Sequence, residues 1–337
     1  MTRLGGGWLA RAETALAGLW ERPSPAPDGP RLPIVVAHRG ASRLQPENTV
    51  AAFAAALDEG ADAIETDVCM TSDRRYVLWH DADPDERVSI AHRWGLIPGL
   101  YVPEVPPVGS HLRRRVRDLS WPQLRANFRY RRSSSGEERQ GAATRPHATI
   151  DTLEELLEWA VGEPEVGDVF LDLKLADDQV GAAVGLYVRV EQARLKEERL
   201  TFHLLTPQRE IARALVERWR ARPDPGLRVT PDFERPGASD LAPRIGAADA
   251  SLGCRGRFWS AFRADVARAV YARSRGRLES VVAWTVNERD RLFEMLELGV
   301  DGILTDEPGL LRSLIPLSSP WEWDRVRAEA AAVPGSV

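Results

Sequence analysis

The chain has 337 residues, of which 43% are hydrophobic and 28% charged, a composition that is ordinary for a globular protein. Its formal net charge of -5 argues against a general nucleic-acid-binding protein, which would usually be basic. No stretch approaches the roughly 20 apolar residues that a membrane-spanning helix needs. Because Cys69 and Cys254 both lie in or beside apolar segments, we expect them to be reduced core residues of a cytoplasmic protein.

The two ends of the chain are predicted to lie outside the main domain. Residues 1–32 combine a short amphipathic helix, with apolar residues between Trp8 and Trp20, and a linker rich in Pro, Ser and Gly. We interpret the helix as packed on the domain; a peripheral contact with a membrane is the alternative, which its low positive charge weakens. Residues 33–315 form the domain, and residues 316–337 are a tail.

Short apolar runs alternate with helical patterns from residue 33 onward. We predict strands at residues 33–37, 63–68, 76–79, 170–174, 200–205, 227–229, 250–252, 280–286 and 302–304, and helices at residues 48–57, 152–159, 182–195, 208–220, 260–275 and 289–298. This alternation implies a parallel sheet, and these strands are one more than a closed eight-stranded barrel needs. Residues 71–75 are too short for a parallel crossover, so the strands on either side should form a hairpin, or one of them lies outside the barrel.

Residues 82–148 are predicted to be an insertion after the third strand. The segment is rich in proline, carries four arginines between Arg113 and Arg117, and has a tip at Ser133 to Gly136 that looks disordered. Because it follows His80 directly, it should lie over the mouth of the barrel. One interpretation is a solvated loop with one or two short helices; the other is a cap that selects substrates and attracts anions.

Histidines and carboxylates lie where apolar strands end. His38 and His80 each follow an apolar run, and Glu65 and Asp67 lie two residues apart within another, so both carboxylates point to one face of that strand. Two histidines beside such a pair supply a general base, a general acid and a site for a hard metal ion. The alternative is a buried carboxylate pair neutralised by arginine.

The chain resembles the glycerophosphodiester phosphodiesterase family over roughly residues 33–311, apart from the insertion. The motifs that carry this resemblance are His38-Arg39-Gly40, Pro46-Glu47-Asn48-Thr49, Glu65-Thr66-Asp67, His80-Asp81, Leu171-Asp172-Leu173-Lys174, Trp284-Thr285-Val286-Asn287 and Gly299-Val300-Asp301-Gly302-Ile303-Leu304-Thr305-Asp306. The resemblance implies a distorted (β/α)8 TIM barrel with its site at the carboxyl ends of the strands. It also implies one divalent cation, usually Mg²⁺ or Ca²⁺, and cleavage of a phosphodiester of glycerol.

The resemblance also implies a role for each matching residue. The metal ligands are Glu65, Asp67 and Asp172; the acid–base pair is His38 and His80; the cationic groups near the phosphate are Arg39 and Lys174. Asp172 departs from the family pattern, in which this ligand is most often glutamate, and with Lys174 it could instead form an internal ion pair. Trp284 is either a wall for the substrate or a core residue. Supporting or capping roles are expected for Glu47 and Asp81, and surface or structural roles for His92, His111, His147 and His203.

Three functions remain open at this point. The leading one is metal-dependent hydrolysis of a glycerophosphodiester to glycerol 3-phosphate and an alcohol, in which the glycerol 2-hydroxyl attacks phosphorus and a cyclic phosphate forms; direct attack by water is the alternative route. The second is a lysophospholipase D or sphingomyelinase D-type lipid hydrolase, because Asp172-Leu173-Lys174 fits the Asp-x-Lys pattern of those enzymes. The third is an inactive barrel that binds phosphorylated ligands, which Asp172 disfavours because aspartate still binds metal. The partner is a small diester or a lysolipid rather than nucleic acid.

Overall fold

The computed structural model describes residues 33–97, 99–133, 147–233, 241–253 and 259–315. The expected N-terminal helix and linker, the C-terminal tail, most of the proposed tip at residues 133–136 and Cys254 lie outside these residues. Within the described part of the chain, no helix has the length and apolar character needed to cross a membrane.

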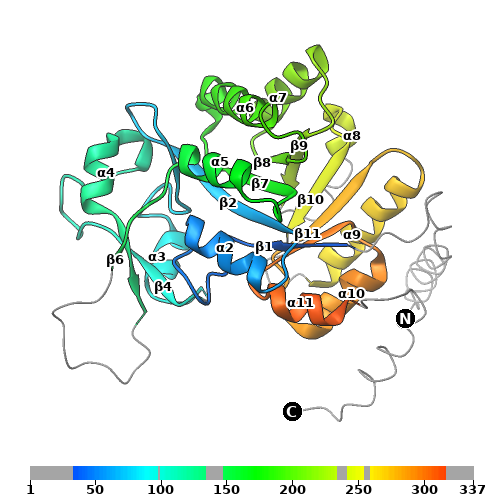
Figure 1. Ribbon diagram of the computed structural model, residues 1–337, viewed down its shortest axis with the longest axis horizontal. Coiled ribbons are helices and arrows are strands. Elements are labelled where there is room, and N and C mark those ends of the chain that lie inside the picture. Colours follow the sequence, from blue (N-terminus) through cyan, green and yellow to red (C-terminus); the bar gives the residue numbers. More distant parts are fainter. Residues whose placement is uncertain (1–32, 98, 134–146, 234–240, 254–258, 316–337) are drawn as a thin grey trace, which may run out of the picture.

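Eight parallel strands in the described residues close into a barrel, which confirms the predicted fold (Figure 1). They are β1 (Ile34–Ala37), β2 (Ala63–Met70), β7 (Asp168–Leu173), β8 (Thr201–Thr206), β9 (Leu227–Phe233), β10 (Asp249–Gly253), β11 (Ser280–Trp284) and β12 (Gly302–Thr305). The order is β1-β12-β11-β10-β9-β8-β7-β2, and parallel pairing of β1 with β2 closes the ring. The carboxyl ends of all these strands therefore meet at one rim.

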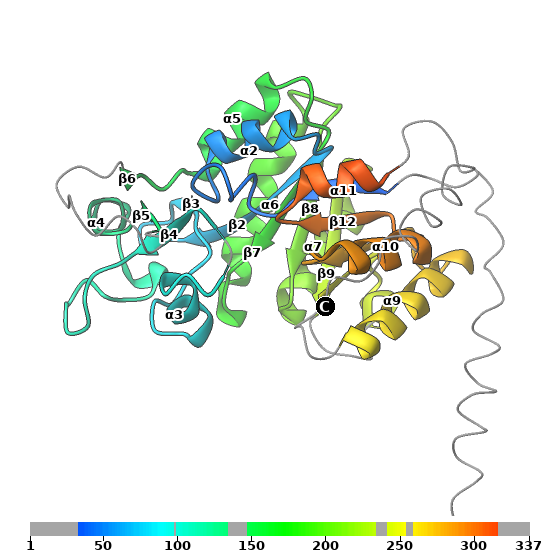
Figure 2. The ribbon, with the colours of Figure 1, turned by 90° about the horizontal axis from the view of Figure 1, so that it is seen from below.

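Helices surround the barrel (Figure 2). They are α2 (Val50–Asp58), α5 (Leu153–Gly162), α6 (Val180–Arg194) with the preceding 3₁₀ turn η2 (Asp177–Gln179), α7 (Arg209–Ala221), α8 (Leu241–Ile245), α9 (Trp259–Ser274), α10 (Arg289–Leu298) and α11 (Pro308–Leu314). Thr152 caps α5, because its hydroxyl accepts from the Glu155 amide and the Glu155 carboxylate accepts from the Thr152 amide. The main core lies between the strands and these helices, and removal of its apolar surface from water is the chief stabilising effect.

The short link at residues 71–75 makes a hairpin, as its length predicted. Strand β3 (Tyr76–Leu78) pairs antiparallel with β2, with Val68 opposite Leu78, and β3 is not part of the closed ring. Strand β3 thereby carries the chain back toward the rim of the barrel, where the Trp79 amide donates to the Asp67 carbonyl at 3.0 Å, and so brings His80 next to Asp67 of β2.

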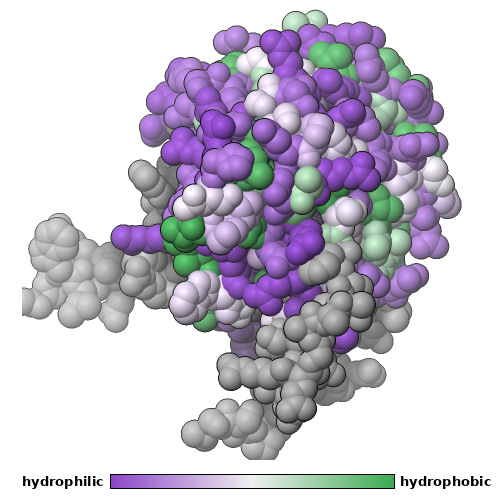
Figure 3. Space-filling view, turned by 90° about the vertical axis from the view of Figure 1, so that its left-hand side faces the viewer, coloured by the Kyte–Doolittle hydropathy of each residue, from purple (hydrophilic) through white to green (hydrophobic). Residues whose placement is uncertain are grey.

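The insertion has a sheet and a core of its own, beside the barrel (Figure 2). It contains α3 (Arg87–Arg93), β4 (Tyr101–Glu104), η1 (Val116–Asp118), α4 (Trp121–Asn127), β5 (Arg129–Arg132) and β6 (His147–Ala148), and β4-β5-β6 form an antiparallel sheet. Trp79 of the hairpin packs against Phe128 and Tyr130, with ring centroids 6.1 and 4.8 Å away. The interpretation as a solvated loop is therefore wrong for these residues, although the outer face of this side is mainly hydrophilic (Figure 3).

Arg228 and Asp249 form an ion pair inside the barrel, at the end opposite the cavity, and this pair should contribute to the free energy of unfolding. The Arg228 guanidinium donates two hydrogen bonds to the Asp249 carboxylate, at 2.6 and 2.7 Å, and Asp249 is 2% exposed. Arg228 and Asp232 lie on the same face of β9, so the pair lies inside the barrel, opposite the rim. In Arg228→Ala the buried Asp249 carboxylate loses its cationic partner and keeps the hydrogen bond from the Ser280 hydroxyl, and we expect the free energy of unfolding to fall by about 2–4 kcal/mol.

Urea denaturation measures this loss, and Glu279→Ala is the matched control. Glu279 accepts from the same guanidinium at 2.8 Å, but its side chain is 68% exposed, so its removal should cost less than about 1 kcal/mol. Equal losses in the two variants would contradict the assignment of stability to the buried Arg228–Asp249 pair.

Candidate active site

A cavity of about 570 Å³ opens at the carboxyl ends of the barrel strands, where the predicted site residues were expected. Its walls include His38, Arg39, Glu65, His80, Asp172, Lys174, Asp232 and Trp284 from the barrel side, and Asp83, Glu86, Val88, Arg115 and Arg117 from the insertion. The insertion therefore forms part of the wall of this cavity, in agreement with its expected position over the mouth of the barrel.

Three carboxylates meet at the rim between β2 and β7. Each of Glu65, Asp67 and Asp172 offers an oxygen, and these oxygens all lie within 4.8 Å of one another. The cause is register: Asp67 lies directly opposite Asp172 in the parallel pairing, and Glu65 is two residues earlier on the same face of β2. The expected convergence of the three acids is thus present.

The electrostatics of this cluster fit a hard divalent cation. Burial raises the pKa of Glu65, and the neighbouring Asp67 and Asp172 carboxylates raise it further. Asp172 Oδ1 is buried and has no hydrogen-bond partner among the described residues. Three carboxylate oxygens at this spacing match the ligands that Mg²⁺ and Ca²⁺ prefer, and a bound cation would remove the repulsion that now disfavours ionised Glu65.

Arg39 and Lys174 bring positive charge to the same cluster. Arg39 Nε lies 3.0 Å from Asp67 Oδ2, and Arg39 Nη1 donates to Glu47 Oε2 at 3.1 Å. Lys174 Nζ donates to Asp172 and lies 3.2 Å from Asp67 Oδ1. The internal pair of Asp172 with Lys174, which the sequence left open, is therefore present within the carboxylate cluster. Burial opposes ionisation of Asp67, but Arg39 and Lys174 lower its pKa.

Asn48 holds Asp67 in place and explains the Pro46–Thr49 motif. Its side-chain oxygen accepts from the Asp67 amide at 3.0 Å and from the Thr66 hydroxyl at 2.8 Å, while Nδ2 donates to Asp67 Oδ2 at 3.0 Å. Asn48 has φ 56°, a left-handed conformation that asparagine tolerates better than most residues. This supporting role was not assigned from the sequence, although the motif contained the residue.

His38 and His80 line the cavity, and each has a carboxylate behind its ring. His38 Nδ1 lies 2.7 Å from Asp306 Oδ1, and His80 Nδ1 lies 2.7 Å from Asp81 Oδ1. Because a carboxylate can only accept, Nδ1 carries the proton in each ring and Nε2 is left available for proton transfer. Burial lowers the pKa of His80, and the Arg39 charge lowers it further, which favours the neutral ring.

Three carboxyl-terminal motif residues support His38. Asn287 Nδ2 donates to Asp306 Oδ2 at 2.6 Å, and Asn287 Oδ1 accepts from the Asp306 amide at 2.8 Å and from the Thr305 hydroxyl at 3.1 Å. Burial opposes ionisation of Asp306, but the pairing with His38 lowers its pKa. The last motif of the chain thus meets the first, since β12 lies beside β1.

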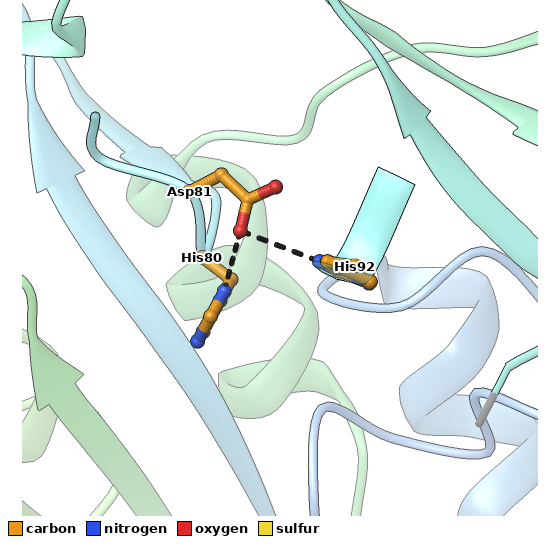
Figure 4. A group of neighbouring side chains, drawn as sticks. All are labelled: His80, Asp81 and His92. Atoms are coloured by element: carbon orange, nitrogen blue, oxygen red, sulfur yellow. Dashed lines mark hydrogen bonds and ion pairs between the residues drawn. The ribbon is translucent and has the colours of Figure 1, made fainter. Parts of the chain in front are cut away.

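His92 is the residue whose importance the sequence concealed. It was expected to be a surface or structural histidine, and it is 2% exposed. Its ring faces Asp81 on one side (Figure 4) and Glu47 on the other. Of the other histidines, His111 is exposed and His203 stacks on Phe170 with ring centroids 3.9 Å apart. The His147 side chain lies outside the described residues.

A polar corner beside Trp284 was also missed. Trp284 lines the cavity together with Asp232, and Gly253 makes room for it, because a Cβ at that glycine would lie 2.4 Å from the indole. Asp232 is 6% exposed, and its Oδ1 has no hydrogen-bond partner in the described part of the chain. Burial raises the Asp232 pKa to about 8, and Asp172 acts in the same direction. The short strand predicted at residues 227–229 ended before Asp232.

Comparison with known proteins agrees with this arrangement. Residues 38–177 match the model of the glycerophosphoryl diester phosphodiesterase family. The glycerophosphodiester phosphodiesterase of Caldanaerobacter subterraneus is 24% identical over 304 residues, which cover 84% of this chain and 97% of that protein. The glycerophosphodiester phosphodiesterase of Bacillus altitudinis is 27% identical over 287 residues, which cover 81% and 94% of the two chains.

Solved structures share the fold. One is the crystal structure of a putative glycerophosphoryl diester phosphodiesterase from Silicibacter pomeroyi. It has a TM-score of 0.62 at 23% identity, and the match covers 88% of this chain and 95% of that chain. A phosphodiesterase of Oleispira antarctica in complex with the product sn-glycerol-3-phosphate has a TM-score of 0.57 at 20% identity, covering 84% and 96%. The chain is thus similar to the glycerophosphoryl diester phosphodiesterase family over residues 38–177, and the solved structures share the fold of the whole domain.

Proposed function

We propose that the protein hydrolyses glycerophosphodiesters to glycerol 3-phosphate and an alcohol, with one divalent cation, Mg²⁺ or Ca²⁺, held by Glu65, Asp67 and Asp172. The observation that supports this most directly is that one cavity joins the three-carboxylate cluster to two histidines, each with Nδ1 bonded to a carboxylate. The match of residues 38–177 to the glycerophosphoryl diester phosphodiesterase family supports the same reaction.

The cavity offers what a phosphodiester needs for cleavage. The substrate is an anion that repels nucleophiles, so its charge must be neutralised before attack. A bound cation would supply Lewis-acid stabilisation of the phosphate oxygens. Arg39 and Lys174 place two further positive charges in the cavity wall, beside the carboxylates, where they would orient the phosphate.

The histidines are proposed to move the protons. His80, whose lowered pKa favours the neutral ring, takes the proton of the glycerol 2-hydroxyl as that oxygen forms a bond to phosphorus. The bond from phosphorus to the alcohol oxygen breaks, and His38 donates a proton to that leaving oxygen. A cyclic phosphate results, and water then opens it with the two roles reversed.

A substrate without the 2-hydroxyl tests this route. For a diester of propane-1,3-diol we expect kcat/KM to fall by at least about 10³-fold, because the intramolecular nucleophile and its high effective concentration are lost. Release of the alcohol measures the rate, and a diester of propane-1,2-diol, which keeps the neighbouring hydroxyl, is the control. Cleavage of both analogues at similar rates would instead support direct attack by water.

Lysophospholipase D or sphingomyelinase D-type activity is the second candidate. The Asp172 and Lys174 pair favours it, and Trp94, Leu96 and Val108 are exposed on the insertion. The buried Asp232 carboxyl group in the cavity wall favours a small polar substrate, because an acyl chain brings no polar partner to it. Relative kcat/KM on glycerophosphocholine and on a long-chain lysolipid, each with Mg²⁺, Ca²⁺ and Mn²⁺, separates the two candidates; we expect the small diester to be preferred.

A further inference from the structure

The insertion places a third histidine behind the catalytic pair. We propose that His92 is a positioning residue: its imidazolium, supplied by helix α3, fixes His80 through Asp81 and fixes Arg39 through Glu47, so that the site is complete only when α3 is seated on the barrel. This inference rests on the proposed function, because it assumes that His80 transfers a proton.

Both nitrogens of the His92 ring face a carboxylate. Nδ1 lies 3.3 Å from Asp81 Oδ1 (Figure 4), and Nε2 on the other side of the ring lies 3.2 Å from Glu47 Oε2. A neutral imidazole has one donor, so both contacts can be hydrogen bonds only when the ring carries two protons. Burial opposes that charge, but the Glu47 and Asp81 carboxylates raise the pKa of His92 to about 9, so the ring is cationic at neutral pH.

The contact with Asp81 bears on the tautomer of His80. Asp81 Oδ1 lies 2.7 Å from His80 Nδ1 as well as 3.3 Å from His92 Nδ1, and the two rings stand edge to face at 5.6 Å. Asp81 is 1% exposed, and its Oδ2 has no hydrogen-bond partner in the residues that the structure covers. With His92 removed, Asp81 could turn away, and the proton of the His80 ring would no longer be held on Nδ1.

The contact with Glu47 reaches the phosphate side of the site. Glu47 Oε2 lies between His92 Nε2 and Arg39 Nη1, at 3.2 and 3.1 Å, and Arg39 Nε lies 3.0 Å from Asp67. Burial would raise the pKa of Glu47, but His92 and Arg39 lower it to about 2, so it stays ionised. Loss of the His92 charge would leave Glu47 with Arg39 alone and allow the guanidinium to be drawn away from Asp67.

The place of His92 in the chain connects these effects to the insertion. Ser89 and His92 are the buried residues of α3, and that helix belongs to the insertion, whereas Glu47 lies between β1 and α2. A helix outside the barrel thus supplies a buried positive charge to two carboxylates on the barrel side. Catalysis should therefore depend on the docking of α3 even though His92 itself does not line the cavity.

The variant His92→Phe tests the inference. Its kcat, KM and pH profile are measured on the same small diester as those of the wild type. We expect kcat to fall by about 10–100-fold, the range typical of residues that orient a functional group through another, with little change in KM. The acidic limb of the kcat/KM profile should move to higher pH, because the positive charge of the neighbouring His92 ring, which opposes protonation of His80, would be gone. Ser89→Ala, on the same buried face of α3, is the matched control and should behave as wild type; its hydroxyl has no hydrogen-bond partner among the described residues.

The other outcomes are equally decisive. The inference is overturned if the His92→Phe variant folds and has the kcat and pH profile of wild type. It is also overturned if the loss of kcat equals the loss of folded protein and the pH profile is unchanged. If the Phe variant does not fold, His92→Gln replaces it, because glutamine keeps one hydrogen-bond donor without the charge. The acidic limb of its kcat/KM profile should move in the same direction by a smaller amount, and an unmoved limb overturns the inference. ¹⁵N NMR of the His80 ring reports the Nδ1–H tautomer without turnover. Absence of turnover in the wild type would count against the proposed function instead.

Discussion

Replacement of His80 with alanine is expected to lower kcat by about 10³–10⁴-fold, because the variant loses the group that accepts the proton of the attacking hydroxyl. The side chain lines the cavity, so the fold should be retained. Steady-state rates of alcohol release from a small glycerophosphodiester measure the loss, and circular dichroism checks the fold.

The pH profile gives this prediction a second readout. Burial and the Arg39 charge lower the pKa of His80 from its ordinary value of 6.5, so the neutral ring, which is the base, persists at neutral pH and is lost on acidification. The kcat/KM of wild type should therefore rise with pH through a midpoint below 6.5 and then level off. In His80→Ala the residual rate should lack this limb.

His111→Ala is the control for both the rate and the pH profile, since the His111 side chain is exposed on the insertion. It should keep the rate and the profile of wild type. If His80→Ala retained more than a tenth of the wild-type rate, or kept the acidic limb, His80 could not be the base, and the two-histidine scheme would have to be abandoned.

The barrel and the centre of its site could be predicted because local patterns determine them. Alternation within a strand puts Glu65 and Asp67 on one face, and in a parallel barrel the ends of all strands meet at one rim, which brings Asp172 and the histidines to the same place. The length of the 71–75 link excluded a parallel crossover and left either a hairpin or a strand outside the barrel; the structure has both, because β3 pairs antiparallel with β2 and lies outside the closed ring.

The insertion could not be predicted in the same way, because its structure depends on contacts distant in sequence. Its core forms where Trp79 of the hairpin meets Phe128 and Tyr130, roughly fifty residues later, and no short-range pattern indicates that contact. For the same reason His92 looked like any other insertion histidine until Asp81 and Glu47 were seen on either side of it.

Asp232 was missed for a different reason. Pro231 and the short apolar run before it made β9 look weak and short, so the carboxyl group at its end was not counted among the rim residues. If the predicted strand had been extended by three residues, alternation would have placed Asp232 on the same inward-pointing face as Arg228 and Thr230.

Removal of divalent cations is expected to abolish turnover, and Mg²⁺ or Ca²⁺ should restore it. Loss of a Lewis acid that contributes several kcal/mol to the transition state corresponds to about 10³-fold or more in rate. Glu65→Gln tests the assigned ligands more narrowly. Glu65 Oε2 accepts from the Arg39 amide at 3.0 Å, and a glutamine oxygen can keep that bond while the negative charge is lost. The variant should therefore fold normally but bind the cation more weakly.

Titration with metal separates this effect from a general loss of activity. We expect the concentration of Mg²⁺ or Ca²⁺ needed for half-maximal rate to rise at least about tenfold in Glu65→Gln, because a hard cation loses one of its anionic ligands. Asp290→Asn removes an exposed carboxylate outside the cavity and should leave the titration unchanged. Calorimetric titration of the enzymes with metal, without substrate, should likewise show weaker binding to Glu65→Gln than to wild type and Asp290→Asn. Full activity in the presence of EDTA would mean that the three acids hold Arg39 and Lys174 rather than an ion, and that those two side chains alone neutralise the phosphate.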